Sequence, residues 1–195
     1  MKRLFDLVAA SFGLVLLAPL FLIVACGIKL DSPGPVFFRQ VRVGRHGRHF
    51  RIFKFRTMTV NAEAKGQITI GRDRRITRLG SALRKFKIDE LPQLINVVLG
   101  DMSLVGPRPE VPYYCEKYPE DARRIVLSVR PGITDRASIE YRDESTLLGA
   151  ADDPERAYVE DILPVKLRYY IEYAETRSLY GDIRIIIDTL RAIWR

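Results

Sequence analysis

An uncharged stretch of 22 residues, positions 7–28, constrains this chain more than any other feature of its sequence. As a helix rising 1.5 Å per residue it would extend about 33 Å, roughly the thickness of the hydrocarbon core of a bilayer. A cleaved secretory signal is one alternative, but Asp6 interrupts the charged start and no small-residue cleavage pattern precedes Lys29. We therefore expect the segment to remain in the membrane.

The middle of this segment and its flanks predict a topology. Pro19 follows Ala18 near the centre, and its ring removes one backbone hydrogen bond, which predicts a kink. Lys2 and Arg3 precede the segment and Lys29 follows it, so the positive-inside rule favours the cytoplasm for both ends. A helix that breaks at the proline and re-enters the same leaflet meets this requirement. An ordinary membrane-spanning helix is the alternative.

Positive charge is concentrated in the middle of the chain. The formal net charge is +8, yet positions 39–87 alone hold 15 Lys and Arg against two acidic residues. Such a block is typical of contact with phosphates in nucleic acid, anionic lipid or a nucleotide, and a solvated basic surface is the alternative. Two cysteines are too few for a disulfide framework and favour a reducing compartment.

Alternation of apolar and polar residues predicts a β-hairpin within the basic block. Strands are expected over 36–43 and 50–56, joined by a turn at 44–47. A short helix is expected over 81–86, and a second one begins close to Asp89 and stops near position 100.

In the C-terminal third we expect one helix or a pair of helices around Pro164 over 154–178, and a further helix over 182–195. The last one carries an apolar stripe that would lie either in the membrane interface or against the domain core. The expected fold class is α/β, mostly helical with a small β-hairpin.

Two adjacent carboxylates, Asp89 and Glu90, follow the basic block. In one interpretation Asp89 caps the following helix and Glu90 complements its dipole. In the other, the surrounding cations lower the carboxyl pKa values, and an anionic Asp89 binds Mg²⁺ or attacks a phosphorus atom. Arg108 stands between Pro107 and Pro109, which hold its backbone nearly fixed and suit its guanidinium to bidentate phosphate binding.

In this order and spacing, the segments resemble the bacterial monotopic phosphoglycosyl transferases, the initiating polyprenyl-phosphate sugar-phosphate transferases also called bacterial sugar transferases. The resemblance covers nearly the whole chain. It is carried by positions 2–6, the Pro19 break, and positions 54–58, 75–80, 89–94, 100–109 and 130–134.

The resemblance implies a re-entrant membrane helix over 1–30 and a compact catalytic domain over 31–195, with amphipathic interface helices, on the cytoplasmic face of the bacterial inner membrane. It implies transfer of a sugar-1-phosphate from a UDP-sugar to polyprenyl (undecaprenyl) phosphate, releasing UMP and initiating the assembly of a glycoconjugate such as an exopolysaccharide. In this scheme Asp89 forms a phosphosugar-aspartyl intermediate, Glu90 assists, and the pair holds Mg²⁺.

The expected phosphate or nucleotide ligands are Arg108 with Pro107 and Pro109, and then Lys54, Arg56, Arg75, Arg84 and Arg130. Two departures from the family pattern occur. Ala18 replaces the serine that often precedes the proline of the helix break. Positions 135–138 read Asp-Arg-Ala-Ser where many members have Gly-Trp-Ala-Gln, a region expected to touch the sugar.

A membrane-anchored module without catalytic activity, binding anionic lipid or nucleic acid through its basic face, is the alternative function. The carboxylate pair and the rigid arginine favour the enzyme. Its expected partners are the UDP-sugar, the polyprenyl phosphate and membrane lipid, without nucleic acid, and a homodimer is left open.

Overall fold

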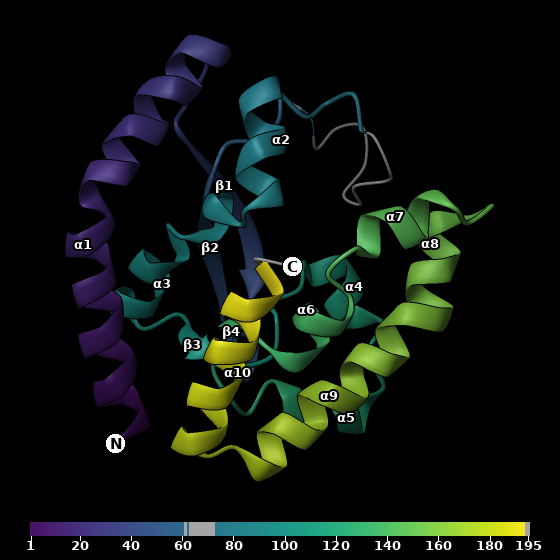
Figure 1. Ribbon diagram of the computed structural model, residues 1–195. Helices are drawn as coiled ribbons and strands as arrows, with labels where there is room; N and C mark the ends of the chain where they lie inside the picture. The colour runs from purple at the N-terminus through teal and green to yellow at the C-terminus, as the bar shows by residue number, and fades with distance from the viewer. Residues whose placement is uncertain (61, 63–72, 194–195) are drawn as a thin grey trace.

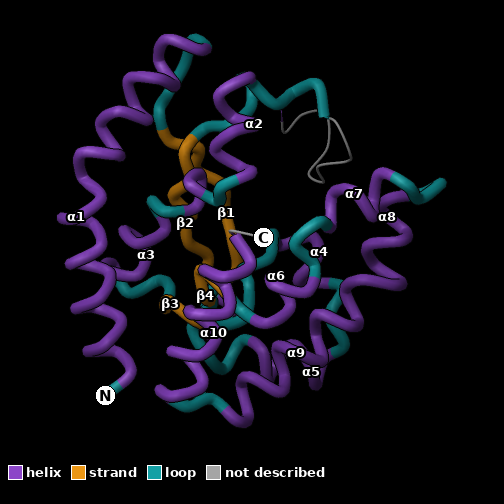
Figure 2. The backbone as a smooth tube through the Cα atoms, viewed as in Figure 1, coloured by secondary structure: helices purple, strands orange, loops and turns teal. Residues whose placement is uncertain are grey.

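The computed structural model describes residues 1–60, 62 and 73–193 (Figure 1). One long helix, α1 (Lys2–Asp31), lies along one side of a domain of shorter helices and two small sheets. The fold is mostly helical, and its strands are short (Figure 2). This agrees with the α/β class predicted from the sequence.

Helix α1 is long and apolar enough to cross a membrane, and only 11% of its most apolar 18-residue window is buried. Its outer face exposes large apolar side chains, among them Leu4, Val8, Phe12, Val15, Leu16, Leu22 and Ile23. Such a face suits association with a membrane. The predicted break at Ala18–Pro19 is wrong in one respect, because the helix continues through Pro19 and only bows in its middle (Figure 1). A single missing hydrogen bond bends a helix whose remaining bonds are intact.

The start of α1 is fixed to the domain by two cations. Lys2 Nζ donates to Asp182 Oδ2 at 2.6 Å and to the Val105 carbonyl at 3.3 Å. Arg3 donates to the carbonyls of Val97 at 2.7 Å and Val98 at 3.2 Å. The polar start of the helix therefore lies against the domain.

The end of α1 is held by Arg56, which is 5% exposed. Its guanidinium donates to the carbonyls of Ser32 at 2.8 Å, Pro33 at 2.8 Å and Pro35 at 2.6 Å. These bonds satisfy acceptors just beyond the last helical turn. Both ends of α1 are therefore hydrogen-bonded to the same domain.

The predicted hairpin is present as β1 (Phe37–Val43) and β2 (His49–Phe55), joined by the turn η1 (Arg45–Gly47). The strands pair antiparallel, from Phe37 opposite Phe55 to Val43 opposite His49. Helix α3 (Gln93–Leu99) lies against β2. The buried Asn96 side chain accepts from Phe53 N at 2.8 Å and donates to the Arg51 carbonyl at 3.0 Å.

The strands β3 (Ser103–Val105) and β4 (Gly132–Thr134) form a parallel pair. They meet so closely that a Cβ on Gly132 would lie 2.1 Å from the Gly106 nitrogen. Only glycine allows this approach, which places the loop that follows β3 and carries Arg108.

The remaining helices surround these sheets. Before β4 come α2 (Arg78–Lys85), η3 (Ile88–Glu90), α4 (Pro112–Glu116) and α5 (Glu120–Val126); after it come α6 (Arg136–Glu140), α7 (Glu144–Gly149), α8 (Pro154–Ala157), η4 (Tyr158–Ile162), α9 (Leu163–Thr176) and α10 (Leu179–Ile193). Pro164 does not separate two helices; it lies in the first turn of α9, after the π-helical turn η4. The largest hydrophobic core lies among α4, α5, η4 and α9.

Helix α10 was expected to lie either in the membrane interface or against the domain core, and the structure agrees with each expectation only in part. Asp182 and Ile185 are buried, and the helix lies beside β3, β4 and α6 (Figure 1). Ile183, Ile187 and Leu190 from the predicted apolar stripe remain exposed. Positions 194–195 of the predicted helix lie outside the described residues.

Candidate active site

A cavity of about 920 Å³ opens beside the hairpin. Its described walls come from β1, β2, α2, η3, the loop after β3, the segment from α6 to α7, and Lys166 of α9. Helix α2 closes one side because Gly80 lets it approach the segment that follows β2: a Cβ there would lie 2.1 Å from the Thr57 carbonyl oxygen. Asp89, Glu90 and Arg108 all line this cavity.

A tight turn places the carboxylate pair. Lys87 adopts the left-handed conformation, with φ 55° and ψ 20°, which costs a non-glycine residue about 1–3 kcal/mol. Asp89 and Glu90 follow in η3, one turn before α3, whose N-cap position is occupied by Pro92. Asp89 Oδ1 is buried and has no hydrogen-bond partner in the described part of the chain. The structure thus does not support the capping role considered for Asp89.

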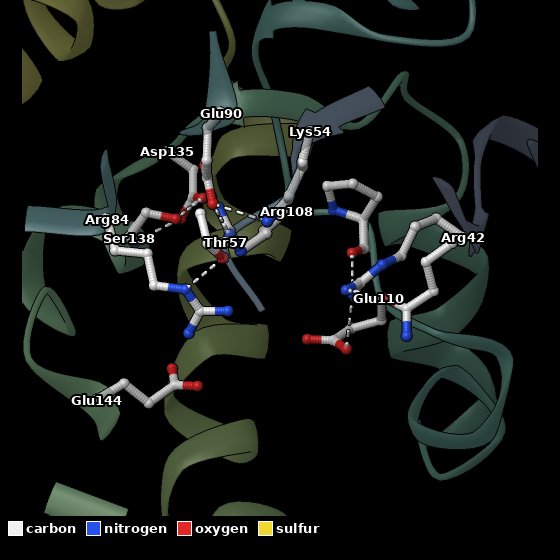
Figure 3. A network of polar contacts seen from close by, with 12 residues as sticks. Arg42, Lys54, Thr57, Arg84, Glu90, Arg108, Glu110, Asp135, Ser138 and Glu144 are labelled. Carbon is white, nitrogen blue, oxygen red and sulfur yellow. Dashed lines mark hydrogen bonds and ion pairs between the residues drawn. The ribbon is translucent and has the colours of Figure 1, made fainter. Parts of the chain in front are cut away.

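Glu90 is neutralised by two cations (Figure 3). Lys54 Nζ donates to Oε1 at 2.8 Å, and Arg108 contacts both oxygens, with Nη1 donating to Oε2 at 3.1 Å. Burial alone would raise the pKa of Glu90, but Arg108 and Lys54 outweigh it and hold that pKa well below its ordinary value. Glu90 is therefore a permanent anion at physiological pH.

Asp89 behaves in the opposite way. Burial, and then the adjacent negative charge of Glu90, raise the pKa of Asp89 to about 6, although Lys54 and Arg84 act against the shift. The prediction that the basic surroundings lower the pKa of both carboxyls is correct for Glu90 and wrong for Asp89. The reason is that Glu90 takes the closest cations, while Asp89 keeps the burial and the like charge. Asp89 remains mostly ionised at pH 7.

The donor set fits a Mg²⁺ ion held partly by substrate. Mg²⁺ is commonly bound through one or two carboxylates together with substrate phosphates and water. Asp89 Oδ1 is a buried acceptor without a donor among the described residues, whereas both oxygens of Glu90 already bind cations. The described residues contain no group of three or more His, Cys, Asp or Glu that could hold a metal. Asp89, rather than Glu90, is thus the side chain available to the ion.

Two further predicted cations line the same cavity. Arg84 Nε donates to Thr57 Oγ1 at 2.8 Å, and burial lowers the pKa of its guanidinium. Arg75 also lines the cavity, and its Nη2 lies 2.6 Å from Asp73 Oδ2. With Lys54 and Arg108, they give the cavity a cationic wall.

The other predicted residues have different positions. Arg56 also lines the cavity, but its guanidinium donates to carbonyls just beyond the end of α1. Arg130 Nε donates to the Gly100 carbonyl at 2.9 Å. Pro107, Pro109 and Arg130 are not among the described residues that line this cavity. The two prolines lie beside Arg108 on the side that faces away from the cavity. Ala18 and Pro19 lie within α1.

Sequence reasoning missed Arg42, Glu110 and Tyr158, which also line the cavity. A signal for Arg42 was present in the hairpin register. Phe38 pairs with Lys54 in β1 and β2, so Arg42, four residues after Phe38, lies on the same face as Lys54. For Glu110 and Tyr158 the sequence held no such signal, because their contact joins positions 48 residues apart.

Comparison with known proteins finds similar sequences. The sequence model of the family described as "Bacterial sugar transferase" matches residues 1–195. UDP-glucose:undecaprenyl-phosphate glucose-1-phosphate transferase of Caulobacter vibrioides is 41% identical over 197 residues, which cover 98% of this chain and 69% of the relative. An uncharacterised sugar transferase of Bacillus subtilis is 40% identical over 194 residues, with 99% and 87% covered.

A third similar protein is much longer. UDP-N-acetylgalactosamine-undecaprenyl-phosphate N-acetylgalactosaminephosphotransferase of Aeromonas hydrophila is 40% identical over 195 residues. The match covers 98% of this chain but 43% of that relative. The chain therefore spans less than half of this relative and most of the Bacillus one.

Proposed function

The chain belongs to the bacterial sugar transferase family, and on this premise we propose that it transfers a sugar-1-phosphate from a UDP-sugar to undecaprenyl phosphate, releasing UMP. The relatives with named activities act on different UDP-sugars, so the proposal is made at the level of the substrate class. The observation that carries it is a buried, unsatisfied Asp89 oxygen beside a cationic wall.

The first half of the proposed reaction is an attack by Asp89. A carboxylate oxygen bonds to the phosphorus that bears the sugar, the bond from that phosphorus to the oxygen of the uridine phosphate breaks, and UMP leaves with the electron pair. Arg108 and Lys54 offset charge on the transferring phosphoryl group. Bound Mg²⁺, with Asp89 as its protein ligand, would neutralise phosphate charge on the donor.

In the second half, an oxygen of undecaprenyl phosphate attacks the same phosphorus and Asp89 is released as a carboxylate. Glu90 takes no part in bond formation. Its negative charge fixes Lys54 and Arg108 at the cavity wall, where they are ready for the phosphates of both substrates. The product would be a lipid-linked sugar diphosphate, the starting point of a glycoconjugate.

The experiment uses the full chain in detergent, undecaprenyl phosphate, and a panel of UDP-sugars, with UMP release as the readout. Asp89→Asn removes the attacking anion and should lower turnover by about 10⁴-fold or more, the scale of losing a nucleophile. Asp121→Asn, which changes an exposed side chain on α5, is the matched control. A phosphosugar adduct on the Asp89 peptide would support the covalent step. Near-normal turnover by Asp89→Asn would overturn it, and absence of UMP release for every sugar would leave the non-catalytic module.

The membrane topology belongs to the same proposal. Both ends of α1 are hydrogen-bonded to one domain, at Lys2 and Arg3 and again through Arg56. A helix crossing the bilayer would carry one end about 30 Å away from a domain on a single side. The two anchored ends therefore favour re-entry through one leaflet, with residues 1–30 dipping in from the cytoplasmic face of the inner membrane. Because α1 is continuous, it would do so by bowing at Pro19 and not by breaking there.

A cysteine inserted after Met1 tests the topology in a Cys26→Ser background. An impermeant thiol reagent should label it in inverted membrane vesicles and not in intact spheroplasts. Labelling in spheroplasts would place the N-terminus outside and establish a spanning helix. A cysteine placed at an exposed position of the domain, Glu120, reports the side on which the domain lies.

A further inference from the structure

The cavity has a second wall that differs in chemistry from the cationic one. It includes Glu110 after β3, Ser138 and Tyr141 around α6, Glu144 of α7, which is ion-paired with Lys166, and Tyr158 of η4. In Figure 3 the carboxylates of Glu110 and Glu144 point toward the same space as the guanidinium of Arg84. Carboxylates repel phosphates but accept hydrogen bonds from hydroxyl groups. This wall therefore suits an uncharged, hydroxyl-bearing part of a ligand.

Each carboxylate oxygen of Glu110 accepts one hydrogen bond. The Tyr158 hydroxyl donates to Oε1 at 2.5 Å. Oε2 receives a hydrogen bond from Val111 N at 3.3 Å, and Arg42 Nη1 lies 3.9 Å away, beyond hydrogen-bond distance. A carboxylate oxygen accepts two hydrogen bonds, so Oε2 retains an unfilled position. The carboxylate is held in place by Tyr158 and still open to a donor.

Arg42 supplies the complementary group. Its Nη1 donates to the Pro109 carbonyl at 3.0 Å and its Nη2 to Gln40 Oε1 at 2.6 Å, but its Nε is buried without an acceptor in the part of the chain that the structure describes. An under-used acceptor and an unpaired donor thus lie on neighbouring side chains. A hydroxyl group can donate to one and accept from the other.

The position of this pair relates it to the donor substrate. Arg108 contacts Glu90, and the next two residues of the same loop, Pro109 and Glu110, contact Arg42. A diphosphate held at Arg108 carries a ring on each side, the transferred sugar and the ribose, and both offer hydroxyl groups. We propose that Glu110 and Arg42 form a subsite for the ring hydroxyls of the UDP-sugar. This inference rests on the proposed function only for the class of ligand, a UDP-sugar.

Equilibrium binding tests the subsite without relying on turnover. The full chain in detergent is titrated with UDP-glucose, UDP-galactose, UDP and UMP. Glu110→Gln replaces the anionic acceptor with a neutral amide and should weaken UDP-glucose binding by about 10-fold or more, the scale of a hydrogen bond to a charged group. Equal binding of all four ligands by the variant and the wild type would overturn the proposal.

The four ligands distinguish the two rings. If the transferred sugar occupies the subsite, Glu110→Gln weakens both UDP-sugars, changes their ratio, and leaves UDP and UMP unaffected. If the ribose occupies it, all four ligands weaken by the same factor. Either pattern supports a hydroxyl subsite. Normal UDP-sugar binding by a wild type that releases no UMP would refute the proposed function and leave this inference standing.

If Glu110→Gln does not fold, a second variant tests the same subsite. Tyr158→Phe keeps the carboxylate but removes the hydrogen bond that orients it, and should weaken binding about 3-fold or more. Tyr113→Phe is the matched control, because it removes a tyrosine–glutamate hydrogen bond of 2.8 Å at the exposed Glu155. If the Tyr158 variant binds every ligand as tightly as the control does, the subsite is excluded.

Discussion

At the junction of α1 and α10 both oxygens of each buried carboxylate have a donor, whereas in the cavity Asp89 Oδ1 has none among the described residues. Asp6 accepts from Ser103 Oγ at 2.8 Å and from Leu104 N at 3.3 Å. Asp182 accepts from Lys2 at 2.6 Å and from the Tyr173 hydroxyl at 2.9 Å. The two regions bury similar groups and satisfy them differently.

This difference distinguishes Asp6 and Asp182, which stabilise the fold, from Asp89, which is able to bind a ligand. A buried acceptor that keeps its donors stabilises the native state, and one without donors lowers its stability until a partner arrives. Glu90 stands between the two types. It is fully paired, yet both of its partners line the cavity and are available to phosphate. The same substitution should therefore have opposite effects in the two regions.

Among substitutions that leave Asp89 in place, the largest effect is expected from Arg108→Lys. Lysine keeps the positive charge but cannot contact Glu90 and a phosphate with a planar fork. We expect kcat/KM for UMP release to fall by about 10- to 100-fold, which corresponds to one charge-assisted hydrogen bond. Arg124→Lys, at an exposed ion pair, is the control. Unchanged kcat/KM in Arg108→Lys would remove Arg108 from the site.

Asp182→Asn tests the junction of α1 and α10, where the buried carboxylates are fully paired. The amide loses the charge attraction to Lys2 while remaining close to Tyr173, so the free energy of unfolding should fall by about 1–3 kcal/mol. Turnover per folded molecule should stay within about 3-fold of wild type. Thermal denaturation in detergent and UMP release measure the two quantities. A loss of turnover without a loss of stability would show that this junction acts on the site directly.

Asp89→Asn should raise stability even as it abolishes turnover. The pKa of Asp89 in the folded protein, about 6, lies above its ordinary value of 3.8, so the folded state loses stability as pH rises through 6. Asparagine has no charge to bury, and the variant should be more stable than wild type at pH 8 by about 1–3 kcal/mol. The advantage should shrink toward pH 4. Lower stability than wild type at pH 8 would contradict the raised pKa.

The smallest effect is the pH dependence of the wild type. Protonation of Asp89, with its pKa of about 6, should lower kcat/KM on the acid side. Burial lowers the pKa of Lys54 to about 8, although Glu90 acts against this, so loss of the ammonium charge should lower kcat/KM on the alkaline side. A profile with half-maximal values near pH 6 and pH 8 is expected. A flat profile between pH 5 and 9 would exclude both groups.

The parts of the fold that depend on residues close together in the sequence could be predicted. The hairpin followed from alternation along 36–56, and the stop of α3 followed from Gly100, which adopts φ 95°. The hydrogen bonds of Arg56 could not be predicted from the sequence, because its acceptors are set by where α1 ends in space. The direction of the Asp89 pKa shift likewise depends on burial. Burial arises from segments distant in the chain.

The ion pair between Lys2 and Asp182 joins positions 180 residues apart. At about 5–20 residues per second, a ribosome needs roughly 10–40 s to make the second partner after the first. Throughout that interval the apolar face of α1 is already complete and its anchor on α10 does not yet exist. In the proposed topology, α1 could therefore enter the bilayer before the domain closes, and the rest of the chain would fold onto a helix held by lipid.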